Sequence, residues 1–171
     1  MILRKFNCET DFSPIAGWIR SDREHAMWCG GRFSFPLERN DFLSVLEEHR
    51  KNTGDLPYMA QDEQGRAVGF FVLSSSPDTG SAMLKFVIVD SAIRGKGVGR
   101  EMIRLAAELA FQDPGVRTLR LCVFAENPAA LRCYQKAGFC LTGTDPNAFH
   151  FRGQLWSLCH MALPRPEQNL L

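Results

Sequence analysis

The chain has 171 residues, of which 45% are hydrophobic and 23% charged, and its formal net charge is +1 at pH 7. This length and composition predict one globular domain over residues 1–171 and exclude a disordered chain, while the near-neutral charge argues against a dedicated nucleic-acid binder. Because no apolar run approaches the roughly 20 residues of a membrane span, and residues 1–6 lack the apolar core of a secretory signal, we expect a cytoplasmic protein without a membrane partner.

The N-terminal third predicts one short strand followed by helices. Phe12, Ile15 and Ile19 recur at helical spacing and would share one face. Glycine and proline residues then interrupt the apolar pattern before a further helix. We expect a strand over 2–5, a helix over 11–20 with Asp11 as its N-cap, a helix fragment and loop over 21–36, and a helix from a cap at Asn40 or Asp41 to about His49.

The rest of the chain alternates strand and helix patterns. A meander of three strands leads into an amphipathic helix, whose apolar residues Val98, Met102 and Leu105 lie at helical spacing. A strand, a helix with Asn127 as its N-cap and two final strands follow. We expect strands over 57–61, 67–74, 81–90, 116–124, 139–144 and 155–163, helices over 97–111 and 128–137, and a loose tail over 164–171.

The strand–helix–strand unit over residues 81–124 requires a parallel crossover connection. Short turns join the strands before it, which favours antiparallel pairing there. The sequence therefore predicts an α/β (or α+β) fold with a single mixed, mostly antiparallel central sheet and helices on both faces.

The six cysteines carry no metal-site signature. None forms a C-x-x-C pair, and no histidine pair lies near them at zinc-ligand spacing. Cys122 and Cys159 lie in apolar runs, which is typical of free buried thiols in a reducing compartment. We expect no metal, and no basic partner in the sequence indicates a catalytic cysteine.

A glycine-rich segment, Arg94-Gly95-Lys96-Gly97-Val98-Gly99-Arg100, joins the strand over 81–90 to the following helix. Glycines leave backbone N–H groups accessible, and the N-terminus of a helix favours phosphate oxygens. Arg94, Lys96 and Arg100 would add mobile positive charge. The alternative interpretation is an ordinary tight connection with packing glycines.

Two nucleotide-binding motifs fail in this segment. A Walker A motif requires serine or threonine after its lysine, but Lys96 is followed by Gly97. A dinucleotide fingerprint counted from Gly95 requires glycine where Arg100 stands, and no acidic residue ends the next strand at the expected distance.

The segment instead resembles the [QR]-x-x-G-x-[GA] loop of the GCN5-related N-acetyltransferase (GNAT) family, with Arg94, Gly97 and Gly99 at the fixed positions. Residues 127–139, NPAALRCYQKAGF, are similar to the N-x-x-A-x-x-x-Y-x-x-x-G-F pattern of the same family. The resemblance covers about residues 56–163. It implies an acyl-CoA N-acyltransferase-like fold, with acetyl-CoA as co-substrate and transfer to a primary amine by direct attack in a ternary complex.

The resemblance also implies roles for individual residues. The strand before the loop would diverge from its parallel neighbour and pair with the pantetheine amides, and a backbone N–H near Val87 would stabilise the oxyanion. The amides of residues 95–100 would hold the pyrophosphate, and Tyr134 would protonate the departing thiolate. The implied cofactor-binding residues are Val87, Ile88, Val89, Arg94, Gly95, Lys96, Gly97, Val98, Gly99, Arg100, Asn127, Ala130 and Tyr134.

The sequence does not indicate a general base. Many relatives carry a glutamate on the strand before the loop, but residues 82–86 include no acid. Glu24, His25, Asp90 and Glu126 are available without a motif behind them. A water chain that ends on backbone carbonyls would also serve.

The acceptor pocket is expected to come from the two N-terminal helices, their loop and the final strands. Mixed charge there favours a polar or cationic amine, and core packing of the tryptophans is the alternative. The residues concerned are Trp18, Arg20, Asp22, Arg23, Glu24 and Trp28.

Two other functions stay open. One is a non-catalytic acyl-CoA-binding sensor of the same fold. The other is a protein N-terminal or lysine acetyltransferase, with a peptide rather than a small molecule as its amine acceptor. A homodimer is common in such folds, although no segment here specifies an interface.

Overall fold

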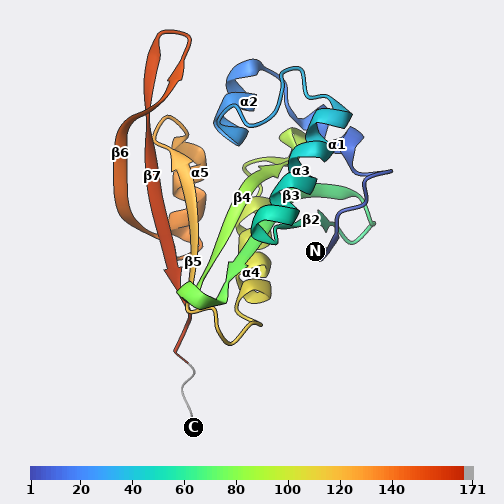
Figure 1. Cartoon of the computed structure of the whole chain (residues 1–171). Helices are drawn as coiled ribbons and strands as arrows, with labels where there is room; N and C mark the ends of the chain where they lie inside the picture. The colour runs from blue at the N-terminus through green and yellow to red at the C-terminus, as the bar shows by residue number, and fades with distance from the viewer. Residues whose placement is uncertain (168–171) are drawn as a thin grey trace.

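A computed structural model of the chain describes residues 1–167. Seven strands form one sheet in the order β1-β2-β3-β4-β5-β7-β6 (Figure 1). Only β4 and β5 are parallel, so the predicted mixed, mostly antiparallel sheet is confirmed. The strands are β1 (Ile2–Lys5), β2 (Leu56–Gln61), β3 (Ala67–Ser76), β4 (Ser81–Val89), β5 (Thr118–Phe124), β6 (Cys140–Phe151) and β7 (Gln154–Pro164).

Helices cover both faces of the sheet, as predicted. Alternation along β3 supplies the two cores: Phe70 and Val72 pack toward α1 and α3, whereas Phe71 and Leu73 pack toward α4 and α5. The helices are α1 (Phe12–Trp18), α2 (Asp22–Cys29), α3 (Arg39–Thr53), α4 (Val98–Ala110) and α5 (Pro128–Lys136). Within residues 1–167, no helix is long and apolar enough to span a membrane.

Helix α3 is longer than predicted at both ends. The carboxylate of Asp41 does not cap it but accepts a hydrogen bond from the Ser34 N–H at 2.7 Å, and the N-cap position is Glu38. Because no helix-breaking residue follows His49 at once, α3 continues until Gly54, whose φ of +68° ends it.

Two further expectations need correction. Asp11 occupies the N-cap position of α1 without capping it, because its carboxylate binds the guanidinium of Arg4 and the N–H of Asn7. The predicted strand over 139–144 is the start of β6, which continues to Phe151 through two changes of register. Its turn-like residues 145–147 lie inside the strand.

The start of the predicted tail is held in place. The N–H of Arg165 donates to the Arg117 carbonyl at 2.8 Å, and its Nε donates to the Val116 carbonyl at 2.8 Å. Pro164 is the last residue of β7. Residues 168–171 of the predicted tail lie outside the described residues.

Candidate functional site

Strands β4 and β5 pair over only part of their length. Residues 81–84 pair with 118–121, after which β4 continues to Val89 and β5 to Phe124 without a further pair between them. Figure 1 shows the two strands meeting at one end and diverging toward the other. The edge of β4 that faces β5 is therefore open to an extended ligand over residues 86–89.

A β-bulge lies at the point of divergence. Val72 pairs with Lys85 and Phe70 with Ile88, so two residues, Phe86 and Val87, stand opposite Phe71. Phe86 has a φ of +50°, a conformation that residues other than glycine rarely adopt. Bulges of this kind bend a strand and turn its backbone groups away from the regular ladder.

A cavity of about 1190 Å³ runs between the diverging strands. Its wall includes Tyr134 of α5 on one face of the sheet, and Trp28 of α2 and His49 of α3 on the other. Lys96 and Val98 are outside this wall and line a separate hollow of about 310 Å³. The other predicted cofactor-binding residues all line the cavity: Val87, Ile88, Val89, Arg94, Gly95, Gly97, Gly99, Arg100, Asn127, Ala130 and Tyr134.

The glycine-rich segment leaves its amides free for a ligand. Gly95 and Gly97 have φ values of +81° and +87°, which favour glycine. Among the described residues, no acceptor binds the N–H groups of residues 95–100. The first-turn amides of α4 belong to this set, and the positive end of the helix dipole reinforces their attraction for an anion.

Arg94 does not supply the mobile charge that the sequence suggests. Its Nε donates to the Val89 carbonyl at 3.1 Å, Nη1 binds Glu24 at 2.9 Å, and Nη2 donates to the Trp18 carbonyl at 3.3 Å. The side chain therefore fixes the loop to the last residue of α1 and to the first turn of α2. The remaining cations on the cavity wall near this loop are Arg100, Arg132 and Lys136.

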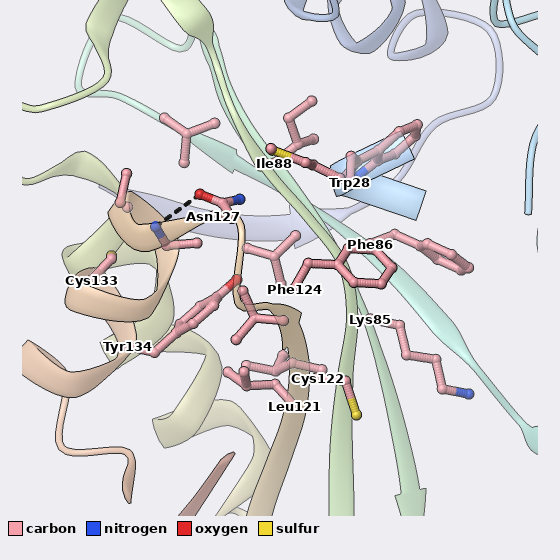
Figure 2. A pocket seen from close by; sticks show the side chains of 18 of the residues that line it. Trp28, Lys85, Phe86, Ile88, Leu121, Cys122, Phe124, Asn127, Cys133 and Tyr134 are labelled. Atoms are coloured by element: carbon pink, nitrogen blue, oxygen red, sulfur yellow. Dashed lines mark hydrogen bonds between the residues drawn. The ribbon is translucent and has the colours of Figure 1, made fainter. Parts of the chain in front are cut away.

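Asn127 is the predicted N-cap of α5, and its Oδ1 accepts a hydrogen bond from the Ala130 N–H at 3.1 Å (Figure 2). Tyr134 lies on the same helix, with only 7% of the residue exposed. Burial, together with the neighbouring Cys133, raises the pKa of Tyr134 above its usual value. The phenol is thus protonated at neutral pH, as a proton donor requires.

The acceptor pocket predicted from the N-terminal segment is present in part. Trp28 and Glu24 of α2 line the cavity, whereas Trp18 is buried in the core beneath α1 and α3. Of the described residues on the cavity wall, Glu24 is the single acidic one, and it already binds Arg94.

The other residues considered as bases lie elsewhere. His25 is buried beside Cys29 and Phe35, and burial lowers its pKa. Asp90 accepts a hydrogen bond from the Ala92 N–H at 2.9 Å and shapes the turn before the loop. Glu126 accepts one from the Ser157 N–H at 3.4 Å. None of the three lines the cavity.

Besides Cys29, which lies beside His25, Cys122 has a histidine partner that could not be predicted from the sequence. Cys122 Sγ lies 3.3 Å from His160 Nδ1, and His160 Nε2 lies 2.7 Å from Asp145 Oδ2. The three residues come from β5, β7 and β6, so only the sheet brings them together. Burial and the charge of Asp145 raise the pKa of the Cys122 thiol, which opposes formation of a reactive thiolate.

A second histidine–aspartate pair, His49 and Asp55, also could not be predicted from the sequence. His49 Nδ1 lies 3.1 Å from Asp55 Oδ2, and Lys85 Nζ lies 2.9 Å from the same oxygen. His49 and Lys85 line the cavity. Asp55 follows the end of α3 and Lys85 lies on β4, thirty positions away, so no local motif connects them.

Comparisons with known proteins agree with this geometry. Residues 19–139 match the model of a family described as the acetyltransferase (GNAT) family. The chain is 28% identical over 147 residues to the aminoglycoside N(6')-acetyltransferase type 1 of Klebsiella pneumoniae, covering 80% of this chain and 72% of that protein. It is 29% identical over 126 residues to a putative phosphinothricin acetyltransferase of Bacillus subtilis, covering 72% and 74%.

The fold is also similar to solved structures. One is the spermidine N-acetyltransferase of Vibrio cholerae in complex with CoA and spermine, with a TM-score of 0.78. The match covers 95% of this chain and 94% of that chain at 22% sequence identity.

Proposed function

The chain belongs to the acetyltransferase (GNAT) family and is an N-acetyltransferase that uses acetyl-CoA, and from this premise we propose that it acetylates the primary amine of a small molecule by direct attack in a ternary complex. The observation that carries this proposal is the cavity between β4 and β5, which opens on both faces of the sheet and joins the open β4 edge to the free amides of residues 95–100.

The residues present fit acetyl-CoA. The free amides of residues 95–100 would hold the diphosphate of acetyl-CoA. The phosphate on its ribose would lie near the cations of the cavity wall, Arg100, Arg132 and Lys136. The open edge of β4 would pair with the pantetheine amides as an added strand does. The thioester would then reach the bulge at Phe86 and Val87.

The reaction follows from these placements. The Val87 N–H would stabilise the oxyanion that develops when the amine attacks the thioester carbonyl carbon. As the C–N bond forms and the C–S bond breaks, the departing sulfur would take the hydroxyl proton of Tyr134. The attacking nitrogen loses one proton as the amide forms, and the Tyr134 phenolate would recover a proton from it by way of solvent. Acetylated amine and free CoA thiol are the products.

The cavity favours an acceptor that is not a polycation. Its acceptor side carries Trp28 and Phe86 together with Arg32, while Lys85 is paired with Asp55 and the single acid of the wall, Glu24, is paired with Arg94. A polyamine or aminoglycoside, which the names of several relatives specify, would meet Arg32 and find no carboxylate on the wall that is not already paired. We infer that the acceptor is a primary amine on an apolar or anionic body, in place of the polar or cationic amine that the mixed charge of the N-terminal segment led us to expect.

Two measurements test this function. Acetyl-CoA at about 100 times its Kd should stabilise the protein by about 2.7 kcal/mol, which corresponds to a rise in Tm of about 5–10 °C. Release of the CoA thiol should then be followed with benzylamine, L-amino acids, spermidine, kanamycin and a short peptide as acceptors, with AMP in place of acetyl-CoA as the thermal control.

Each result has a defined meaning. Absence of a thermal shift at millimolar acetyl-CoA would refute the proposal. A shift without turnover on any amine would favour the acyl-CoA sensor, and turnover on the peptide alone would favour a protein acetyltransferase. Spermidine or kanamycin as the best acceptor would contradict the inferred acceptor class while leaving acetyl transfer intact.

A further inference from the structure

His49 lines the cavity on the face where the proposed acceptor amine would lie, and Asp55 is buried behind it. The His49 ring packs edge-on against the ring of Phe86, with the centroids 5.6 Å apart. Phe86 is the bulge residue that immediately precedes Val87, the proposed oxyanion donor. His49 therefore stands on the α3 face of the sheet beside the reacting carbonyl, opposite the α5 face that carries Tyr134.

Figure 2 shows how Tyr134 and Lys85 lie about the gap between the strands. Tyr134 points from α5 toward the gap, whereas Lys85, another partner of Asp55, projects from the far side of β4. His49, which lines the cavity from α3, and Tyr134, which lines it from α5, thus lie on opposite faces of the sheet.

Asp55 fixes the orientation and tautomer of His49. The Asp55 residue is only 1% exposed. Burial opposes its charge, but hydrogen bonds from Thr53, Lys85 and His49 outweigh this and lower the pKa of Asp55 below its usual value. Because the carboxylate is ionised, the His49 Nδ1 carries the proton and donates it to Oδ2, which leaves the Nε2 lone pair available.

The other groups on the cavity wall are poorly suited to accept a proton. Glu24 already binds Arg94 at 2.9 Å. The thiols of Cys29, Cys122 and Cys133 have raised pKa values because they are buried. Among the described residues that line the cavity, His49 is the single imidazole.

We propose that His49 is the general base of the reaction and that Asp55 is its positioning residue. This inference rests on the proposed acetyl transfer. The Nε2 of His49 takes the proton that the ammonium group of the acceptor must lose, and the nitrogen lone pair so freed attacks the thioester carbonyl carbon. Asp55 stabilises the imidazolium, which returns its proton to water. The charged groups that bear on His49 are Asp55, before β2, Lys85 of β4, and Arg32, which lines the same cavity.

The test compares three variants over pH 6 to 9.5 with the panel amine that gives the highest kcat/KM. His49→Gln should lower kcat/KM at pH 7 by about 100-fold, within the usual range for a general base. The deficit should shrink as the pH rises toward the pKa of the amine, because the free amine then no longer needs the base. Asp55→Asn should give a smaller loss, with a changed pH profile.

His160→Gln is the matched control. Its imidazole also binds an aspartate at 2.7 Å but is outside the cavity wall, so this variant should keep the wild-type profile. Because His160 contacts Cys122, which lines the cavity, the same variant also tests whether the amine proton could instead leave through Cys122 to His160. The Kd for acetyl-CoA should stay within about twofold of the wild-type value in all three variants, because none of the changed residues contacts the phosphate loop.

Several outcomes would overturn the proposal. These are a wild-type pH profile for His49→Gln, a deficit that is the same at every pH, or a loss in His160→Gln that equals the loss in His49→Gln. If His49→Gln is unstable, His49→Ala with added imidazole replaces it, and absence of rescue is then the contrary result. Failure of the wild-type protein to turn over any amine would instead count against the proposed function.

Discussion

The phenol of Tyr134 is buried on α5 against the cavity, and removing its hydroxyl changes one atom. We predict that Tyr134→Phe lowers kcat by about 100-fold, because the thiolate must then leave without its proton donor. The Kd for acetyl-CoA, measured by titration calorimetry, should change by no more than about twofold. A mainly weakened Kd with unchanged kcat would show that Tyr134 serves binding alone.

The burial of Tyr134 also allows a prediction about the pH dependence of kcat. Because burial raises the pKa of Tyr134 above that of a free phenol, the hydroxyl keeps its proton at least to the ordinary tyrosine value of about 10. The kcat of the wild-type protein should therefore show no alkaline decline between pH 8 and 9.5. A decline that is absent from Tyr134→Phe would contradict this assignment.

The ion pair between Arg4 and Asp11 lies outside the candidate site, and we expect it to contribute to the stability of the fold. Two guanidinium N–H groups donate to the two carboxylate oxygens at 2.6 and 2.7 Å, and Asp11 is only 2% exposed. We predict that Asp11→Asn lowers the free energy of unfolding by about 1–2 kcal/mol at pH 7, because a part-buried ion pair loses one of its charges and Arg4 is partly screened by solvent. Urea denaturation measures this change.

The pH dependence of that loss has a definite sign. Burial raises and the bonds from Arg4 and Asn7 lower the pKa of Asp11, and the net shift is downward from 3.8. The stabilisation is thus fully present above the unfolded pKa and is lost as the pH falls through the lower, folded pKa. The difference between wild type and Asp11→Asn should therefore be constant from pH 7 to about 5 and shrink below about 4.

At the scale of elements, the loop before α4 depends on backbone conformation. A Cβ on Gly97 would meet no atom within 4 Å, yet its φ of +87° strains any side chain. We predict that Gly97→Val raises the Kd for acetyl-CoA at least about tenfold and lowers the free energy of unfolding by about 1–3 kcal/mol. Calorimetry and urea denaturation measure the two effects.

Gly17 provides the matched control. It lies inside α1, has no positive φ, and a Cβ there would also meet nothing within 4 Å. Gly17→Ala should leave the Kd unchanged and raise stability by up to about 1 kcal/mol. Equal effects of the two substitutions on the Kd would refute a specific role for the loop conformation.

Elements with a strong local signal could be predicted from the sequence. Helix α5 carries a capping Asn127, a proline at its first position and Gly138 with a φ of +95° at its end, so its bounds differ from the prediction by one residue. Strand β6 could not be predicted in full, because Asp145, Pro146 and Asn147 favour a turn. Pairing with β7 outweighs that preference, and changes of register accommodate it.

At the scale of the whole molecule, the part of the candidate site that is local in the sequence could be predicted. The glycine-rich loop directly precedes α4, and Asn127 directly precedes α5. Sequence spacing alone therefore predicts both. His49 and Asp55 gain meaning only when β4 brings Phe86 and Lys85 against them. A contact between residues thirty or more positions apart, which the sheet alone creates, leaves no periodic signal.

The cavity passes through the sheet, which predicts the kinetic pattern. In the proposed ternary complex acetyl-CoA and the amine occupy it from opposite faces, so both can be bound together and neither must leave before the other arrives. Initial rates at varied concentrations of both substrates should give intersecting rather than parallel double-reciprocal lines. Parallel lines, or a stable acetylated protein detected by mass spectrometry, would contradict direct attack.

Continuity of this passage has a pharmacological consequence. A single molecule in which the sulfur of CoA is joined to an amine by a short acetyl-like bridge would thread the opening between β4 and β5 and fill both halves at once. Tethering makes the second half bind at a high effective concentration, so the conjugate should inhibit far more strongly than CoA and the amine do when added separately. Its affinity, compared across a series of attached amines, would also identify the natural acceptor.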